Sequence, residues 1–258
     1  MTQQNRPILK IEGLNLSFGD HFVLNDVNCH IGEGEIVALI GPNGGGKTCL
    51  LNCISGYYKP QKGSIFFGDK EITKLPIHKR ARLGLGRTFQ TSQLYRGMTV
   101  MENLISARHI FTKSSLLSEA IYLGPASKEQ TRQREEIEFI IDLLEMPHIR
   151  NSIVGGLPYG LQKRVDLGRA LALEPKVLLL DEPMAGMSRD EKEDLARFIL
   201  DIYELRKTPA LLVEHDMDVV MDITDRIVVF DYGHKIADGT PGEIRTDPGV
   251  IKAYLGEE

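Results

Sequence analysis

One stretch of the chain joins a short apolar run to a glycine-rich loop, and it constrains the fold more than any other part of the sequence. Residues 36–40 are all apolar, and the next eight residues fit the pattern G-x-x-x-x-G-K-[ST] without a break. These eight are Gly41, Pro42, Asn43, Gly44, Gly45, Gly46, Lys47 and Thr48. The order predicts a buried strand, a loop that binds phosphate and the start of a helix, with a simple connecting turn as the less favoured alternative.

The residue types of the loop suit the phosphates of a nucleotide. Glycines let successive backbone N–H groups turn towards one anion, and the following helix adds the positive end of its dipole. We expect Lys47 to neutralise the β- and γ-phosphates and Thr48 to offer its hydroxyl to Mg²⁺, a hard cation that prefers oxygen ligands. Cys49 follows and shares a helical face with Cys53, so we expect both thiols to be reduced and packed as small apolar groups.

The composition favours a globular domain and argues against several other classes. The chain has 258 residues, of which 42% are apolar and 26% charged, so it can bury a complete core. Its net charge is −5 and its basic residues are dispersed, which argues against a nucleic-acid partner. No apolar run is long enough to span a membrane and the polar first residues hold no signal-peptide core, so we expect a cytoplasmic chain.

The hydrophobic pattern predicts strands of two kinds and therefore an α/β fold. Apolar and polar residues alternate over 14–18 and 27–31, and residues 64–67 precede a turn signal, as in antiparallel strands. The continuous apolar runs 177–180 and 210–213 are typical of buried parallel strands.

The middle of the chain, roughly 95–170, is predicted to be helical. A capping box at Ser127 predicts the start of one helix, and apolar residues then recur at helical spacing from 137 to 144. A second box at Ser188 predicts another helix, whose core face would lie within 195–202.

Polar residues stand directly after the two predicted parallel strands. Asp181 and Glu182 follow the first strand, and His215 follows the second. The carboxyl ends of parallel strands meet at one edge of a sheet, so we expect these side chains to face the phosphate-binding loop. Asp181 would then hold Mg²⁺ through water, Glu182 would activate the attacking water as general base, and His215 would contact the γ-phosphate or orient that water. Solvated or structural positions are the alternative for all three.

With these motifs in this order, the chain resembles the nucleotide-binding subunits of ABC transporters over essentially its whole length. The resemblance implies an α/β P-loop NTPase fold of the ABC ATPase kind, with a mixed sheet core, an antiparallel β subdomain and a helical subdomain. It implies that residues 1–258 form a single ABC ATPase domain. Within it we expect a core with the antiparallel β subdomain (1–94 and 171–232), a helical subdomain (95–170) and a C-terminal tail (233–258).

The resemblance also assigns roles that the residues alone leave open. Phe18 stands where the family places an aromatic ring that stacks on adenine, with core packing as the alternative. Gln90 stands where a glutamine meets Mg²⁺ and senses the membrane partner. The segment 157–162 takes the place of the family signature, usually LSGGQ, and would meet ATP held by the opposite subunit through Tyr159, Gly160, Leu161 and Gln162.

Four positions depart from the family pattern, and two of them, Tyr159 and Leu161, are differences within the signature. Pro158 replaces the signature serine, so the hydroxyl that touches the γ-phosphate is lost, whereas we take Gly160 and Gln162 as retained. Ser188 stands where the family usually has an aspartate that communicates across the dimer.

Within this superfamily the chain is most similar to the LivG-type ATP-binding subunits of branched-chain amino-acid importers. This narrower resemblance lies in four segments: 86–90, 98–104, 213–217 and the C-terminal 239–256. It implies an ATPase bound to the inner face of the cell membrane, with a second ABC ATPase subunit, two membrane permease subunits and an external substrate-binding protein. Residues 90–96 would receive a helix of the permease.

Motifs of the motor do not identify its cargo, because relatives with the same motifs serve importers of urea, amides or aromatic acids. A soluble ABC ATPase, as in iron–sulfur assembly, would keep the site but need no membrane partner. A small-molecule kinase would share the phosphate-binding loop but leave 157–162 and His215 unexplained.

Overall fold

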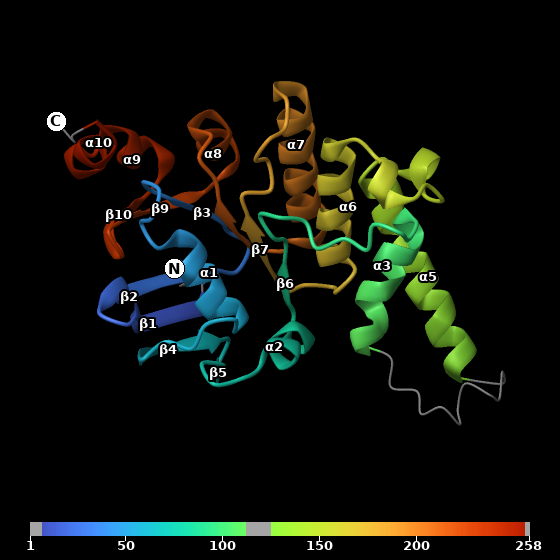
Figure 1. Cartoon of the computed structure of the whole chain (residues 1–258), viewed down its shortest axis with the longest axis horizontal. Helices are drawn as coiled ribbons and strands as arrows, with labels where there is room; N and C mark the ends of the chain where they lie inside the picture. Colours follow the sequence, from blue (N-terminus) through green and yellow to red (C-terminus); the bar gives the residue numbers. More distant parts are fainter. Residues whose placement is uncertain (1–6, 112–124, 256–258) are drawn as a thin grey trace, which may run out of the picture.

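The N-terminal part of the chain folds into an antiparallel sheet, as its alternating pattern predicts (Figure 1). The structure is a computed structural model that describes residues 7–111 and 125–255. Leu9 and Ile11 of the first strand are buried, and after an irregularity in the strand so are Leu14 and Leu16. The sheet has the order β2-β1-β4-β5, with β1 Pro7–Phe18, β2 His21–Gly32, β4 Lys62–Phe67 and β5 Lys70–Glu71.

A six-stranded sheet in the order β10-β9-β3-β8-β7-β6 forms the centre of the molecule. Its strands run parallel except β10, which pairs antiparallel with β9, so the sheet is mixed as predicted. Because β10 belongs to it, the sheet extends beyond residue 232, where the sequence placed the start of a tail. The bounds are β3 Ile36–Ile40, β6 Leu85–Arg87, β7 Val177–Asp181, β8 Ala210–Val213, β9 Arg226–Asp231 and β10 His234–Gly239.

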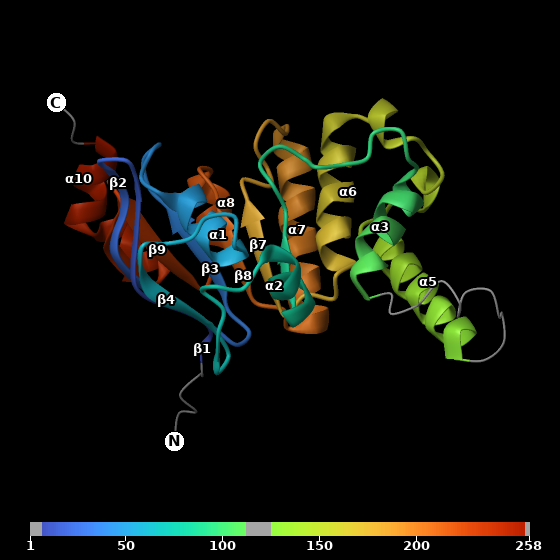
Figure 2. The ribbon, with the colours of Figure 1, turned by 60° about the horizontal axis from the view of Figure 1, so that its bottom comes forward.

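Helix α1 (Lys47–Ser55) lies between the two sheets (Figures 1 and 2). Its side chains Leu50 and Cys53 are completely buried, in a cluster that also contains Leu9 of β1 and Leu39 of β3. Packing from both sides fixes the start of α1 beside the end of β3, which is the strand, loop and helix succession that the sequence predicts.

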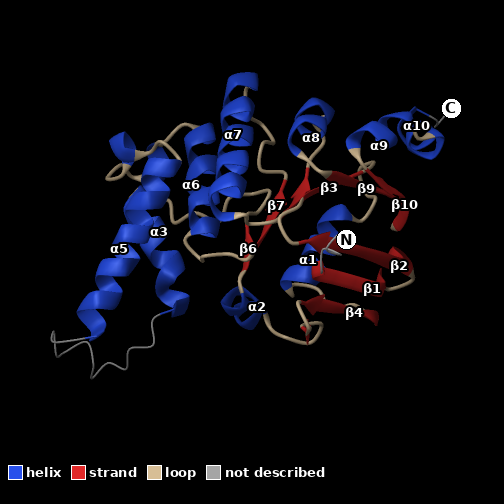
Figure 3. Ribbon diagram, turned by 180° about the vertical axis from the view of Figure 1, so that it is seen from behind, coloured by secondary structure: helices blue, strands red, loops and turns tan. Residues whose placement is uncertain are grey.

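Most of the other helices cover the opposite face of the six-stranded sheet and extend beyond its ends, whereas α2 (Ile77–Leu83) lies beside α1 (Figures 2 and 3). Two of them, α7 (Arg189–Arg206) and α8 (Met217–Ile223), pack on the sheet itself. The helical part consists of α3 (Val100–Arg108), α5 (Pro125–Leu143) and α6 (Tyr159–Leu171). The C-terminal end of the chain consists of α9 (Pro241–Thr246) and α10 (Pro248–Leu255). Short turns of 3₁₀ helix cover His109–Phe111, Pro147–Ile149 and Val154–Gly156.

One of the two predicted helix starts is confirmed and one is wrong. Ser188 caps α7: its hydroxyl accepts from the N–H of Glu191, whose carboxylate accepts from the Ser188 N–H. In contrast, α5 already includes Pro125, so Ser127 lies inside the helix and is not its cap.

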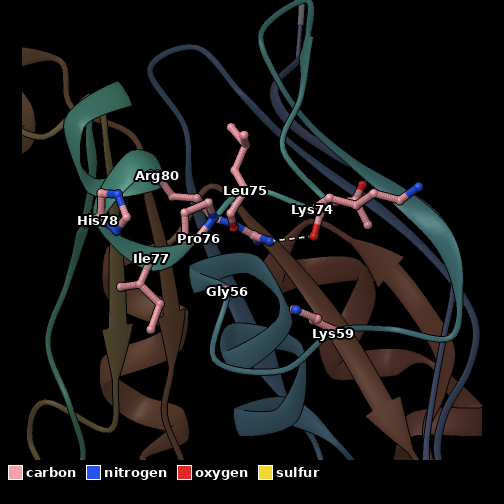
Figure 4. A pocket seen from close by; sticks show the side chains of 9 residues that line it. Gly56, Lys59, Lys74, Leu75, Pro76, Ile77, His78 and Arg80 are labelled. Carbon is pink, nitrogen blue, oxygen red and sulfur yellow. Dashed lines mark hydrogen bonds between the residues drawn. The ribbon is translucent and has the colours of Figure 1, made fainter.

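A buried arginine of α2 (Ile77–Leu83) holds the far end of α1 (Figure 4). Arg80 is 1% exposed, and its guanidinium donates to the carbonyls of Cys53 and Ile54 in the last turn of α1. It also donates to the carbonyls of Thr73 and Leu75 in the loop before α2. Helix ends leave such carbonyls without an intrahelical partner, so Arg80 replaces those missing bonds.

We expect Arg80→Met to lower the free energy of unfolding by about 3 kcal/mol or more, because several buried carbonyls lose a charged donor together. Denaturant unfolding followed by circular dichroism measures this change. Lys79→Met, an exposed position of the same helix, is the matched control. Equal stability of the two variants would contradict the role of Arg80.

Candidate functional site

The phosphate-binding loop follows a backbone path that only glycine accepts at two positions. Gly41 has a φ of 141°, and a Cβ there would lie 1.9 Å from the carbonyl oxygen of Phe230. Gly46 has a φ of 97°, and a Cβ there would lie 2.7 Å from the carbonyl oxygen of Val23. The loop is therefore packed directly against β9 and β2, which holds its shape.

Lys47 is a buried cation at the start of α1. Its Nζ donates to the carbonyl oxygens of Gly41 at 2.6 Å and Pro42 at 2.8 Å. Burial lowers the pKa of Lys47, and the negative charge of Glu182 opposes this shift. Phosphate oxygens are stronger acceptors than neutral carbonyls, so the arrangement suits transfer of this ammonium to a nucleotide.

The structure brings Thr48 and Asp181 together from elements far apart in the sequence. The Thr48 hydroxyl donates to the Asp181 carboxylate at 3.4 Å, and Asp181 is 2% exposed. These oxygen donors fit a hard divalent cation. Within the described residues no three His, Cys, Asp or Glu side chains gather as a metal site, so such an ion would also need phosphate oxygens and water.

Arg87 also contacts Asp181, and it was not predicted as a site residue from the sequence. Its guanidinium donates to Asp181 at 2.8 Å and to the hydroxyl of Ser55 at 2.5 Å. The guanidinium carbon also lies 4.8 Å from the centre of the Phe89 ring. Arg87 lies in the segment 86–90, which we used only for its resemblance to the family. Its position three residues before Gln90 could have identified it as a site residue.

Three predicted residues meet at the carboxylate of Glu182. Gln90 Nε2 donates to Glu182 Oε2 at 2.7 Å, and His215 Nε2 lies within hydrogen-bonding distance of Glu182 Oε1, at 2.9 Å. Glu182 itself has a φ of 47°, a conformation that non-glycine residues rarely adopt. The polar residues that follow the two parallel strands therefore lie side by side, and the side chain of Gln90 contacts Glu182 rather than Thr48 or Asp181.

A second buried carboxylate supports this arrangement from behind. Glu214 is 4% exposed and accepts from the N–H groups of Met184 at 2.9 Å and His215 at 3.2 Å. Burial raises the pKa of Glu214. It ties the turn after Glu182 to the turn that carries His215, and sequence reasoning passed over it although it stands directly between a buried strand and His215.

The side chain of Phe18 is half exposed to solvent. It is 50% exposed at the end of β1, and its ring meets that of Tyr58 edge to face at 5.2 Å. Core packing, the alternative reading of this residue, is therefore wrong, because half of its surface remains open.

The segment expected to contact a second subunit forms the start of α6. Tyr159 and Leu161 are exposed or half-exposed, whereas Gly160 is buried against Glu191. Gln162 donates its side-chain amide to the carbonyl of Leu157 at 2.8 Å. Five residues counted from Leu157 end at Leu161, so Gln162 lies one position beyond the signature glutamine, and treating it as retained was wrong.

None of the described hydrogen bonds or ring contacts joins the start of α6 to the phosphate-binding loop of the same chain.

The thiol of Cys49 lies one residue beyond Thr48 and packs partly against the core. Burial raises its pKa, and the negative charge of Asp181 raises it further. Burial also raises the pKa of Cys29 and of Cys53 to about 12. All three are therefore thiols rather than thiolates near neutral pH.

We expect iodoacetamide to modify Cys49 more slowly than free cysteine at about pH 8, and faster as the pH rises, because only the thiolate reacts. Asp181→Asn should accelerate the modification, since the neutral amide no longer raises the pKa of the thiol. Peptide mapping by mass spectrometry measures both rates. A rate unchanged by Asp181→Asn would contradict the proximity of the two side chains.

In the part of the chain that the structure describes, no helix is long and apolar enough to cross a membrane.

Comparison with known proteins gives a consistent result. Residues 24–185 match the family model "ABC transporter", and residues 234–258 match "Branched-chain amino acid ATP-binding cassette transporter". The ATP-binding protein BraF of Pseudomonas aeruginosa is 42% identical, over 98% of this chain and 99% of its own. LivG of Escherichia coli is 40% identical, over 98% and 99% respectively. Both names specify high-affinity branched-chain amino acid transport.

Solved structures agree with the sequence relatives. The ADP conformation of MJ1267, an ATP-binding cassette of an ABC transporter, has a TM-score of 0.83 at 32% identity, over 97% of this chain and 99% of the other. Its nucleotide-free form matches equally well, with a TM-score of 0.83. Together with the phosphate-binding loop and the acids at the strand ends, these matches show that the chain belongs to the ATP-binding subunits of ABC transporters.

Proposed function

We propose that this chain is the ATP-hydrolysing motor of an importer for branched-chain amino acids. The observation that carries the proposal is the Glu182 carboxylate, held by Gln90 and His215 close enough to Lys47 to affect its pKa. Likeness to BraF and LivG over the full chain supports the cargo class.

ATP binds at the start of α1. The loop 41–46 and the N–H groups that follow, including that of Cys49, surround the phosphates, while Lys47 neutralises their charge. The half-exposed ring of Phe18 stacks on the adenine.

Mg²⁺ would be held by Thr48 and Gln90, and by Asp181 through water, and when bound it neutralises charge on the phosphates. Glu182 accepts a proton from water as the water oxygen forms a bond to the γ-phosphorus. The bond from that phosphorus to the bridging oxygen breaks, and ADP and phosphate result. His215 holds the Glu182 carboxylate in place and stabilises the charge that develops on the γ-phosphate.

Two ATPase subunits close around the nucleotides, and each presents the start of its α6 to the ATP of the other. Tyr159, Gly160 and Leu161 make this contact, with Gln162 behind them, and Pro158 supplies no hydroxyl to it. Closure is a two-state change biased by the γ-phosphate. It moves two permease subunits, which receive cargo from an external binding protein, so the motor lies on the inner face of the cell membrane.

Two other functions fit the same site. A related importer for urea, an amide or an aromatic acid would use an identical motor. A soluble ABC ATPase, as in iron–sulfur assembly, would use it without a membrane. Membrane fractionation separates the last case: the importer motor sediments with membranes only when its permease genes are present, whereas a soluble ATPase stays in the supernatant in both strains.

We expect Glu182→Gln to reduce ATP hydrolysis by about 10²–10⁴-fold while ATP binding changes little, because the base is lost and the phosphate-binding loop remains. Steady-state phosphate release and calorimetry measure the two quantities. Glu193→Gln, at an exposed position of α7, is the control. Near-normal hydrolysis by Glu182→Gln would reject its role as base.

Lys47→Ala should instead weaken ATP binding itself. Loss of a charged donor to phosphate costs about 1.5–3 kcal/mol, which raises Kd by about 10- to 100-fold. Titration calorimetry with Lys62→Ala, an exposed lysine of β4, as control checks this. An unchanged Kd would show that the phosphates bind elsewhere.

A further inference from the structure

One face of α6 carries three polar side chains that all reach the segment around Gln90. Lys163, Asp166 and Arg169 follow one another at intervals of three residues, so they lie along one side of the helix. Arg169 donates to the carbonyl of Gln93. Lys163 is 3% exposed and Asp166 is 5% exposed, and charges buried to this degree are costly unless they have a specific partner.

The Lys163 ammonium joins two backbones whose side chains are already bonded to each other. Its Nζ donates to the carbonyl oxygen of Gln90 at 2.7 Å and lies 3.5 Å from that of Glu182. The side chains of the same two residues meet at 2.7 Å. A single cation therefore fixes the distance between the glutamine and the carboxylate, without contacting either side chain.

Asp166, one turn further along α6, holds the residue before Gln90 and balances the buried cation. Burial raises the pKa of Asp166 to about 6, and this shift is opposed by the backbone N–H of Phe89, from which the carboxylate accepts, and by the charges of Lys163 and Arg169. One of its oxygens, Oδ2, has no partner within the described residues. The backbone N–H of Phe89 and the backbone carbonyl of Gln90 are thus both bound to side chains of α6.

The same lysine also contacts the segment expected to meet the opposite subunit. Lys163 Nζ lies 5.7 Å from the centre of the Tyr159 ring, and Tyr159 is the first residue of α6. The start of α6, Gln90 and Glu182 consequently share one buried charge, so a shift of α6 changes the position of both other residues.

We propose that Lys163, with Asp166 beside it, is a positioning residue that sets the Gln90 to Glu182 contact and links it to the start of α6. The proposal rests on the function proposed above, because it takes Glu182 as the base. Lys163 does not touch the phosphate-binding loop in any described contact, so its loss should affect turnover rather than nucleotide binding.

The test compares Lys163→Met and Lys163→Arg in the full chain. Methionine keeps the length and loses the donor, so we expect the kcat for ATP hydrolysis to fall by about 10- to 100-fold with KM changed less than about threefold. Arginine keeps a charged donor and should restore most of the rate. Lys70→Met, an exposed lysine of β5, controls for the loss of charge.

A double-mutant cycle separates positioning from a general loss of stability. If Lys163 acts on the Gln90 to Glu182 contact, Lys163→Met should lower kcat much less in a Gln90→Ala background than in the wild type. The proposal would be overturned if the losses in kcat of the two single variants multiplied in the double variant, or if ATP affinity fell as much as kcat. It would also be overturned if Lys163→Arg did not restore the rate. Thermal unfolding confirms that each variant is folded, and Lys163→Gln, too short to reach both carbonyls, replaces Lys163→Met if that variant does not fold.

Failure of the two proposals can be distinguished. Normal hydrolysis by Glu182→Gln would reject the proposed base, whatever the lysine does. Loss of hydrolysis in Glu182→Gln together with a kcat within about twofold of wild type in Lys163→Met would overturn only the role of Lys163.

Discussion

The contact on which the site depends is the pair of bonds that hold the Glu182 carboxylate between Gln90 and His215. These residues come from three separate segments, and the sheet brings them together. Strands β7 and β8 pair in parallel with Asp181 opposite Val213, and the N–H of Glu182 donates to the Val213 carbonyl at 3.0 Å. Glu182 stands one residue beyond this pair and His215 two residues beyond it, so the acid and the histidine meet where the two strands leave the sheet.

The rest of the fold keeps the phosphate-binding loop fixed relative to this contact. Helix α1 is packed between two sheets, and Arg80 binds its far end, so the helix cannot shift along its axis without breaking buried bonds. Its near end is shaped by Gly41 and Gly46, where the backbone of β9 and β2 leaves no room for a side chain. The loop around Gln90 therefore connects this core, through Glu182, with helix α6, through Lys163.

Local patterns were enough to predict much of this molecule. The strand, loop and helix at 36–48, the polar residues after two buried strands and the cap at Ser188 each depend on neighbours in sequence, and the structure contains them. The role of a side chain that binds a backbone carbonyl far away in the sequence could not be predicted from such local patterns. Lys163 contacts Gln90 across 73 residues, and no pattern around either position signals it.

The helix start that differs from the prediction and the partner of Gln90 both depend on tertiary structure. Ser127 has the residues of a capping box, but the helix that contains it begins no later than Pro125. The hydrogen bond between Gln90 and Glu182 joins residues 92 positions apart, and sequence spacing could not reveal it.

The most direct test of the motor function is uptake of labelled leucine, isoleucine and valine by cells that lack this chain, with urea and benzoate measured in parallel. We expect a loss confined to the three branched-chain amino acids, restored by the wild-type chain and not by Glu182→Gln. Unchanged uptake of all three, or equal rescue by Glu182→Gln, would contradict an ATP-hydrolysing motor for branched-chain amino acids.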